Sequence, residues 1–158
     1  MLFRSWGANG SGQTTPKAGT YVRISAGGDH TCALTTSGSV QCWGANGKGQ
    51  SSPTSGTYDQ VTSGSDHSCA LSSAGQIDCW GANTSGQSSP PSGRFIDISA
   101  GDKHTCAVDT MGGVTCWGAN GDGQTNAPPG SFDEVVAGGS HTCALDTNGV
   151  VSCWGANG

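Results

Sequence analysis

The eight cysteines and four histidines of this 158-residue sequence are the residues best suited to chemistry, and they recur with one period. The two cysteines of each pair are ten residues apart, and successive pairs are 37 residues apart. A histidine stands two residues before the first cysteine of every pair. The residues are Cys32/Cys42, Cys69/Cys79, Cys106/Cys116 and Cys143/Cys153, preceded by His30, His67, His104 and His141. Such cysteines can form disulfides, or they can bind zinc together with histidine.

The spacing within a cysteine pair fits a β-hairpin centred on Ser37. Such a hairpin places Leu34 opposite Val40 and Cys32 opposite Cys42. Directly opposed residues of an antiparallel ladder lie about 4.5 to 5.5 Å apart, which is within reach of a disulfide. We therefore predict four disulfides, one per pair, and an extracellular or otherwise oxidising location.

Zinc is the main alternative for these residues, with reduced buried thiols as the other. A histidine and the two cysteines of one pair supply only three ligands, whereas structural zinc has four. The position opposite His30 is Gly44, which offers no side chain. We therefore expect no metal site and no cofactor.

The histidines could also take part in acid-base catalysis with a neighbouring carboxylate. Asp29-His30 and Asp66-His67 are the candidate pairs. Adjacent residues of a strand point to opposite faces, however, and the histidines recur in every copy, whereas a single active site breaks the repeat. We interpret the four histidines as structural hydrogen-bonding residues and predict that the chain is not an enzyme.

The elements that must position these residues are four copies of a 37-residue unit. Five tryptophans, each opening a Trp-Gly-Ala-Asn sequence, mark the period, and it holds without an insertion. A fixed period of this size is typical of repeat architectures, in which each unit buries its apolar surface against its copies. The tryptophans are Trp6, Trp43, Trp80, Trp117 and Trp154, the copies are residues 11–47, 48–84, 85–121 and 122–158, and residues 1–10 form a leading strand that completes a blade.

Each copy is predicted to be a small antiparallel sheet without a helix. A polar connection with a recurring proline precedes a strand that ends at glycine, and a three-residue corner leads into the hairpin. Pleat alternation places Cys32, Leu34 and Val40 on one face and Trp43 on the other. Both faces carry apolar groups, so we expect both to be covered, with each indole packed against the disulfide face of a neighbouring sheet. The recurring Asn-Gly that follows is predicted to supply the positive φ angles of a tight turn.

Composition limits both the fold and the partners. Only 33% of the residues are hydrophobic and 28 are glycine, so stacking of repeats has to supply the burial that a conventional core would give. Eleven acidic residues exceed six basic ones, giving a net charge of −5 without a basic cluster. Binding to nucleic acid or to an anionic membrane surface is therefore disfavoured. No apolar run is long enough to span a membrane, and the first residues lack the pattern of a signal peptide.

Residues 26–34 (AGGDHTCAL) and 40–50 (VQCWGANGKGQ), with their counterparts in the other copies, resemble repeats of the regulator of chromosome condensation family. The short period and the Gly-Gln-Thr-Thr-Pro connection are most similar to the β-lactamase-inhibitor propellers of that superfamily. This resemblance implies an all-β β-propeller with four-stranded blades, four blades per chain. It also implies that the histidines and tryptophans are mostly structural.

The polar corners are the expected binding surface. The inhibitor propellers carry aromatic residues there as part of a protein-binding rim, whereas this chain carries mostly charged and hydroxyl side chains. We expect a non-enzymatic, secreted binding or structural assembly module whose corners hold a protein or a glycan. The alternatives are a protein inhibitor or glycan-binding propeller, and an excerpt of a longer propeller with an enzymatic role. The candidate binding residues are Asp29, Asp66, Asp102, Lys103 and Ser140.

Self-association is the last expectation from the sequence. Four small blades are few for a closed ring, and residues 2–6 repeat the pattern of residues 150–154. The chain is therefore expected to have two exposed ends and to associate end to end. Two chains related by a twofold axis would give an eight-bladed ring, and an open arrangement would give a filament.

Overall fold

The computed structural model describes residues 6–157, which form twelve β-strands in four sheets. Within this range no helix has the length and apolar character that a membrane crossing requires. The strands are β1 (Tyr21–Ala26), β2 (His30–Thr35), β3 (Val40–Gly44), β4 (Gln60–Ser63), β5 (His67–Leu71), β6 (Ile77–Gly81), β7 (Phe95–Ala100), β8 (His104–Asp109), β9 (Val114–Gly118), β10 (Phe132–Ala137), β11 (His141–Asp146) and β12 (Val151–Gly155).

Every repeat folds into one three-stranded antiparallel sheet whose strands follow one another in chain order. The predicted hairpin register is confirmed, since Leu34 pairs with Val40, Cys32 with Cys42 and His30 with Gly44. The same register recurs in the other three hairpins. All four predicted disulfides are present, and the Cα atoms of each pair are 4.0 to 4.1 Å apart. Because these sulfurs are bonded to each other, they cannot act as the thiolate ligands of a zinc site.

The resemblance implied four strands per blade, and this expectation is wrong for the described residues. The connection that would supply a fourth strand folds into turns instead. In the first repeat these turns are closed by hydrogen bonds from the Gly12 N–H to the Asn9 carbonyl and from the Thr15 N–H to the Gly12 carbonyl. The Asn9 side chain also accepts a hydrogen bond from the backbone N–H of Thr14. These local bonds use the backbone groups that a further ladder would need. Part of the predicted leading strand, residues 1–5, lies outside the described residues, and residues 6–10 are not in a strand.

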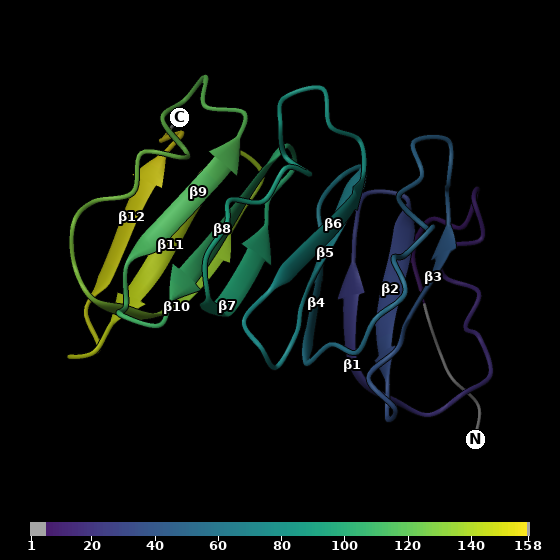
Figure 1. Cartoon of the computed structure of the whole chain (residues 1–158). Helices are drawn as coiled ribbons and strands as arrows, with labels where there is room; N and C mark the ends of the chain where they lie inside the picture. Colours follow the sequence, from purple (N-terminus) through teal and green to yellow (C-terminus); the bar gives the residue numbers. More distant parts are fainter. Residues whose placement is uncertain (1–5, 158) are drawn as a thin grey trace.

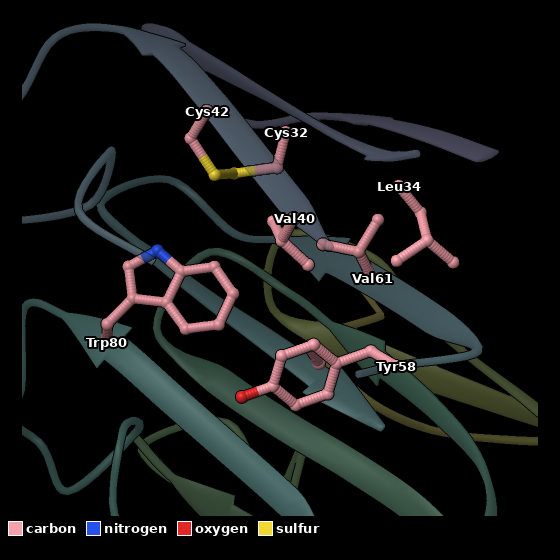
Figure 2. Packing of buried hydrophobic residues seen from close by; sticks show 8 residues of the cluster. Cys32, Leu34, Val40, Cys42, Tyr58, Val61 and Trp80 are labelled. Atoms are coloured by element: carbon pink, nitrogen blue, oxygen red, sulfur yellow. A yellow bond between two sulfur atoms is a disulfide. The ribbon is translucent and has the colours of Figure 1, made fainter. Parts of the chain in front are cut away.

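The sheets stack in chain order, as Figure 1 shows from the blue β1–β3 sheet to the yellow and green strands of the last repeat. Strand β4 contacts β1 and β2, β7 contacts β4 and β5, and β10 contacts β7 and β8. Between the first two sheets, Trp80 and Val61 pack with Leu34 and the Cys32–Cys42 disulfide (Figure 2). The next two junctions repeat this core with Trp117 and Trp154. The predicted packing of an indole on the preceding disulfide face is therefore confirmed at three junctions.

Coverage of the disulfide faces is less complete than the sequence led us to expect. The pairing itself is as predicted for Cys69–Cys79 and Cys106–Cys116. However, Cys79 and Cys116 are only half-buried, although Cys69 and Cys106 are fully buried. The half-buried cysteines lie on β6 and β9, which are edge strands, whereas their partners lie on the central strands β5 and β8. An edge strand has a neighbour on one side only, which allows solvent to reach these two residues, although Cys42 on the edge strand β3 is buried. The expectation of full coverage is wrong at Cys79 and Cys116.

The turn after the tryptophan differs from the prediction. Gly47 and Gly121, the glycines of two Asn-Gly pairs, do not have positive φ; Gly44 and Gly49, on either side of the first, do. The Asn46 side chain closes the loop by accepting a hydrogen bond from the backbone N–H of Ser51. This loop therefore needs the asparagine but not the glycine that follows it, which explains why Thr84 can stand at the corresponding position.

Candidate interaction surfaces

The buried histidines connect each repeat to the next. Nε2 of His67 lies 2.8 Å from Oγ1 of Thr105, and this hydroxyl donates a hydrogen bond to the backbone carbonyl of Gln87. Because the hydroxyl proton is used on that carbonyl, the Nε2 atom must carry the proton that joins ring and hydroxyl. The same contact joins His30 to Ser68 at 2.7 Å and His104 to Thr142 at 2.9 Å.

Burial keeps these rings neutral. The pKa of His67 is lowered to about 4, mainly by burial and in smaller part by repulsion from the neighbouring His30 and His104 rings when these are charged. Burial also lowers the pKa of His30 and of His104, although nearby aspartates act in the opposite direction. The Nδ1 atoms of all three rings are buried without a hydrogen-bond partner. The predicted structural role therefore fits the geometry of these three histidines, which lie between sheets.

A buried glutamine in each connection completes the junction, and the sequence analysis missed it. The carbonyl of Gln50 accepts hydrogen bonds from the indole N–H of Trp80 and from the Ser68 hydroxyl. Its side-chain oxygen accepts a bond from the backbone N–H of Lys48. The signal was available, because the glutamine recurs with the 37-residue period; the set is Gln13, Gln50, Gln87 and Gln124.

The structure separates the five predicted binding residues into two groups. The carboxylates of Asp29 and Asp66 accept hydrogen bonds from Gln13 and Gln50 of their own repeats, at 3.0 and 3.3 Å. These two aspartates therefore help to hold the connection. Asp102, by contrast, accepts a hydrogen bond from the hydroxyl of Ser65 in the preceding repeat, at 2.9 Å.

Asp102 and Ser65 line a depression of about 320 Å³ to which all four corners contribute. We call this depression, together with the adjacent exposed Lys103, the corner surface. Most of its other lining residues are alanine or glycine, including Gly28 and Gly139 at the positions equivalent to Ser65 and Asp102. Ser140 follows Gly139 and is half-buried beside the depression rather than part of its lining. The repeats therefore build a common frame, and only the two middle repeats add hydrogen-bonding side chains to its lining.

Comparison with protein-family models gives a match in every repeat. The model of the regulator of chromosome condensation (RCC1) repeat matches residues 21–50, 58–87, 95–124 and 132–158. The chain belongs to the RCC1 repeat family. A comparison with curated protein sequences found no match.

Several solved structures share this fold. The ectodomain of the receptor kinase CR4 from Physcomitrella patens is 29% identical with a TM-score of 0.77, and the match covers 89% of this chain and 42% of that one. The ectodomain of the Arabidopsis thaliana kinase ACR4 is 29% identical with a TM-score of 0.72, over 84% of this chain and 49% of that one. Yeast RCC1 (Prp20), solved bound to Kap60, is 20% identical with a TM-score of 0.75, and the match covers 89% of this chain and 45% of that one.

The RCC1-repeat chain thus spans less than half the length of these structures. The narrower likeness to β-lactamase-inhibitor propellers is not confirmed by the comparisons. The four disulfides and the two receptor ectodomains are consistent with an extracellular location.

The first strands of the four RCC1 repeats form a second depression, of about 330 Å³, which the sequence analysis did not identify. Equivalent positions on β1, β4, β7 and β10 carry Arg23, Gln60, Asp97 and Glu134, which all line it. The side chains of this row differ in charge among the four copies. Its charge runs from positive on the first repeat to negative on the last two.

The two ends of the RCC1-repeat stack expose the faces that internal repeats bury. On the first repeat Ile24 is 70% exposed, whereas its counterparts Val61, Ile98 and Val135 are buried. On the last repeat Val151 is 61% exposed and His141 is exposed, unlike the three other histidines. Trp6 is 84% exposed, so the structural role predicted for it is not seen in residues 6–157.

Proposed function

We propose that the chain is a non-enzymatic extracellular binding module that holds a protein partner on the corner surface. Its relatives support a binding role, since one yeast Prp20 structure contains Kap60 and another is described with binding to Gsp1p and histones. The buried, neutral histidines support a non-enzymatic role, because their Nε2 atoms are engaged at the junctions. The disulfides favour secretion.

The observation that carries this proposal is the break in repeat symmetry at the corner surface. A partner that binds in one orientation needs side chains that differ among the repeats. Asp102 supplies a carboxylate fixed by the Ser65 hydroxyl, and Lys103 supplies a neighbouring positive charge. The glycines around them leave backbone exposed to a partner.

The chemistry of the corner surface suits a polypeptide. A lysine or arginine of the partner can pair with Asp102, and a carboxylate can pair with Lys103. The lining residues include no aromatic ring on which a sugar could stack. A protein loop with both charges is therefore favoured over a glycan.

Selection from a random peptide library displayed on phage, with the whole chain as bait, tests this site. The selected peptides should carry a basic residue, and their affinity should fall about tenfold for Asp102→Asn. The matched controls are Asp122→Asn and Lys48→Gln, which change exposed charges in the connections. Peptides that bind equally well to the double variant Asp102→Asn/Lys103→Gln, or binding to a glycan array instead, would refute the proposal.

Self-association is a second function favoured by a separate observation. The exposed Ile24 face and the exposed Val151 face lie on the first and last repeats, at opposite ends of the stack (Figure 1). Both faces are apolar, and the equivalent faces at the junctions between repeats are covered by the neighbouring sheet. We propose that they cover each other in an assembly of two or more copies, and measurement of the molar mass by light scattering across the micromolar range tests this.

A further inference from the structure

We propose that the last repeat of one chain docks on the first repeat of a second copy in the same register as the three internal junctions. This inference rests on the proposed self-association and specifies its geometry. The contact is head to tail, so it joins two different faces rather than one face to itself.

The last repeat presents the disulfide half of a junction. Its depression of about 520 Å³ is lined by His141, the Cys143–Cys153 disulfide and Trp154. Cys32, Leu34 and Val40 form the equivalent surface of the first repeat, where Val61 and Trp80 of the next repeat cover them (Figure 2). The open face of the last repeat therefore lacks the indole, the aliphatic side chain and the tyrosine ring that cover the first repeat.

The first repeat presents the missing half. Ile24 and Tyr21 stand at the positions of Val61 and Tyr58, which are buried in the first junction. Tyr21 and Ile24 are not buried, and the ring of Trp43 lies next to Tyr21, with ring centroids 6.3 Å apart. Docked in register, Trp43 would lie over the Cys143–Cys153 disulfide as Trp80 lies over Cys32–Cys42.

The polar groups of the two faces also match. The Nε2 atom of His141 would meet the hydroxyl of Thr31, which donates to the Gln13 carbonyl as its counterparts donate to theirs. The backbone N–H of Tyr21 would meet the carbonyl of Gly149, since Tyr58, Phe95 and Phe132 each donate to the equivalent glycine of the preceding repeat, at 2.8 to 3.0 Å. Both new bonds thus copy bonds made inside the chain.

Charge favours this pairing of ends. The row of equivalent residues on β1, β4, β7 and β10 is Arg23, Gln60, Asp97 and Glu134, so the third internal junction places two carboxylates on neighbouring strands. A head-to-tail contact places Glu134 of one copy beside Arg23 of the other. The contact between copies lacks one hydrogen bond of the internal junctions. At those junctions the hydroxyls of Ser25, Thr62 and Ser99 accept a hydrogen bond from a backbone N–H of the next repeat, whereas Val136, at the equivalent position of the last repeat, has no hydroxyl.

Two single variants and their mixture test the register. Ile24→Asp blocks the face of the first repeat and Val151→Asp blocks that of the last, and both side chains are exposed, so folding should persist. Each variant alone should be monomeric in sedimentation velocity, because each retains only one half of the junction. Their equimolar mixture should form a dimer with one contact. The matched control is Met111→Asp, at a residue 84% exposed on the β8–β9 loop, which should assemble like the wild type.

The outcomes separate the two proposals. A wild-type chain that stays monomeric would overturn self-association and this inference together. A wild type that associates while Ile24→Asp or Val151→Asp alone still dimerises would overturn only the head-to-tail register. As a second readout, His141→Ala and Thr31→Val should each weaken association about 3- to 10-fold, and the double variant should be little weaker than either.

Discussion

The Nε2 atom of His67 lies 2.8 Å from Oγ1 of Thr105, so a buried hydrogen bond joins β5 of the second repeat to β8 of the third. Bonds of this kind join neighbouring sheets beside the apolar cluster of each junction. Their loss is therefore expected to lower the free energy of unfolding.

Replacing Thr105 with valine should destabilise the chain by about 1 to 3 kcal/mol, because the shape is kept while the His67 N–H loses its buried acceptor. The free energy of unfolding from urea denaturation, followed by circular dichroism, measures this. Thr115→Val on β9 is the control, since Thr115 is exposed. Equal losses for both variants would show that the junction bond contributes nothing.

Stability should fall as the pH is lowered from about neutral through the range below 6.5. The pKa of His67 is lowered from 6.5 to about 4 in the folded chain, so between these values the unfolded state takes up a proton that the folded state does not. His67 alone accounts for a loss on the order of 3 kcal/mol by the lower end of that range.

Thermal unfolding as a function of pH tests this effect. His67→Gln should be less stable at neutral pH but should show a flatter dependence between neutral pH and about pH 4.5. His141→Gln serves as the control, because His141 is exposed. A variant at His67 that keeps the full slope would contradict the assignment.

Gly101→Ala should disrupt the third junction. A Cβ at this position would overlap both the His104 ring and the backbone carbonyl of Gly138, and the carbonyl cannot move without displacing the next sheet. The expected loss is about 3 kcal/mol or more, within the range of overpacked cores and strained contacts. Gly121→Ala is the matched control, since a Cβ there would meet no heavy atom within 4 Å. Chemical denaturation compares the two, and equal stability would contradict the close packing.

The Cys143–Cys153 disulfide should be reduced before the other three. Cys153 is exposed, whereas Cys79 and Cys116 are only half-buried and Cys42 is buried, and thiol exchange needs access to a sulfur atom. Limited reduction of the dilute chain followed by alkylation and peptide mass spectrometry gives the order. Earlier modification of Cys42 than of Cys153 would show that exposure does not control reduction here.

The register of the hairpins could be predicted because it depends on local spacing. A sequence separation of ten between Cys32 and Cys42, with a turn at Ser37-Gly38, leaves one arrangement in which the sulfurs face each other, and the structure has this arrangement. The alternation of a pleated strand then places Trp43 on the opposite face from Cys42. Packing of an indole on a disulfide face followed from these two facts.

The hydrogen bonds across the junctions could not be assigned in the same way. The recurrence of Gln50 and Ser68 was visible in the sequence, but their partners lie in different segments or repeats, and spacing does not identify them. The hydrogen bond that the Asp66 carboxylate accepts from the Gln50 side chain of its own repeat was likewise not foreseen. The glycines with positive φ stand beside the Asn-Gly pairs, because the Asn46 side chain and not a tight turn closes that loop.

The sequence by itself determined the repeat, the four disulfides and the face on which each tryptophan lies, because all three depend on distances along one chain. Only the tertiary structure decided which of the repeated residues are buried. Ile24 and His141 occupy the same repeat positions as their buried counterparts, yet they are exposed because no neighbouring sheet within residues 6–157 covers them. Burial depends on what packs against a residue from outside its own repeat, and the repeat pattern does not show which copies have a neighbouring sheet on both faces.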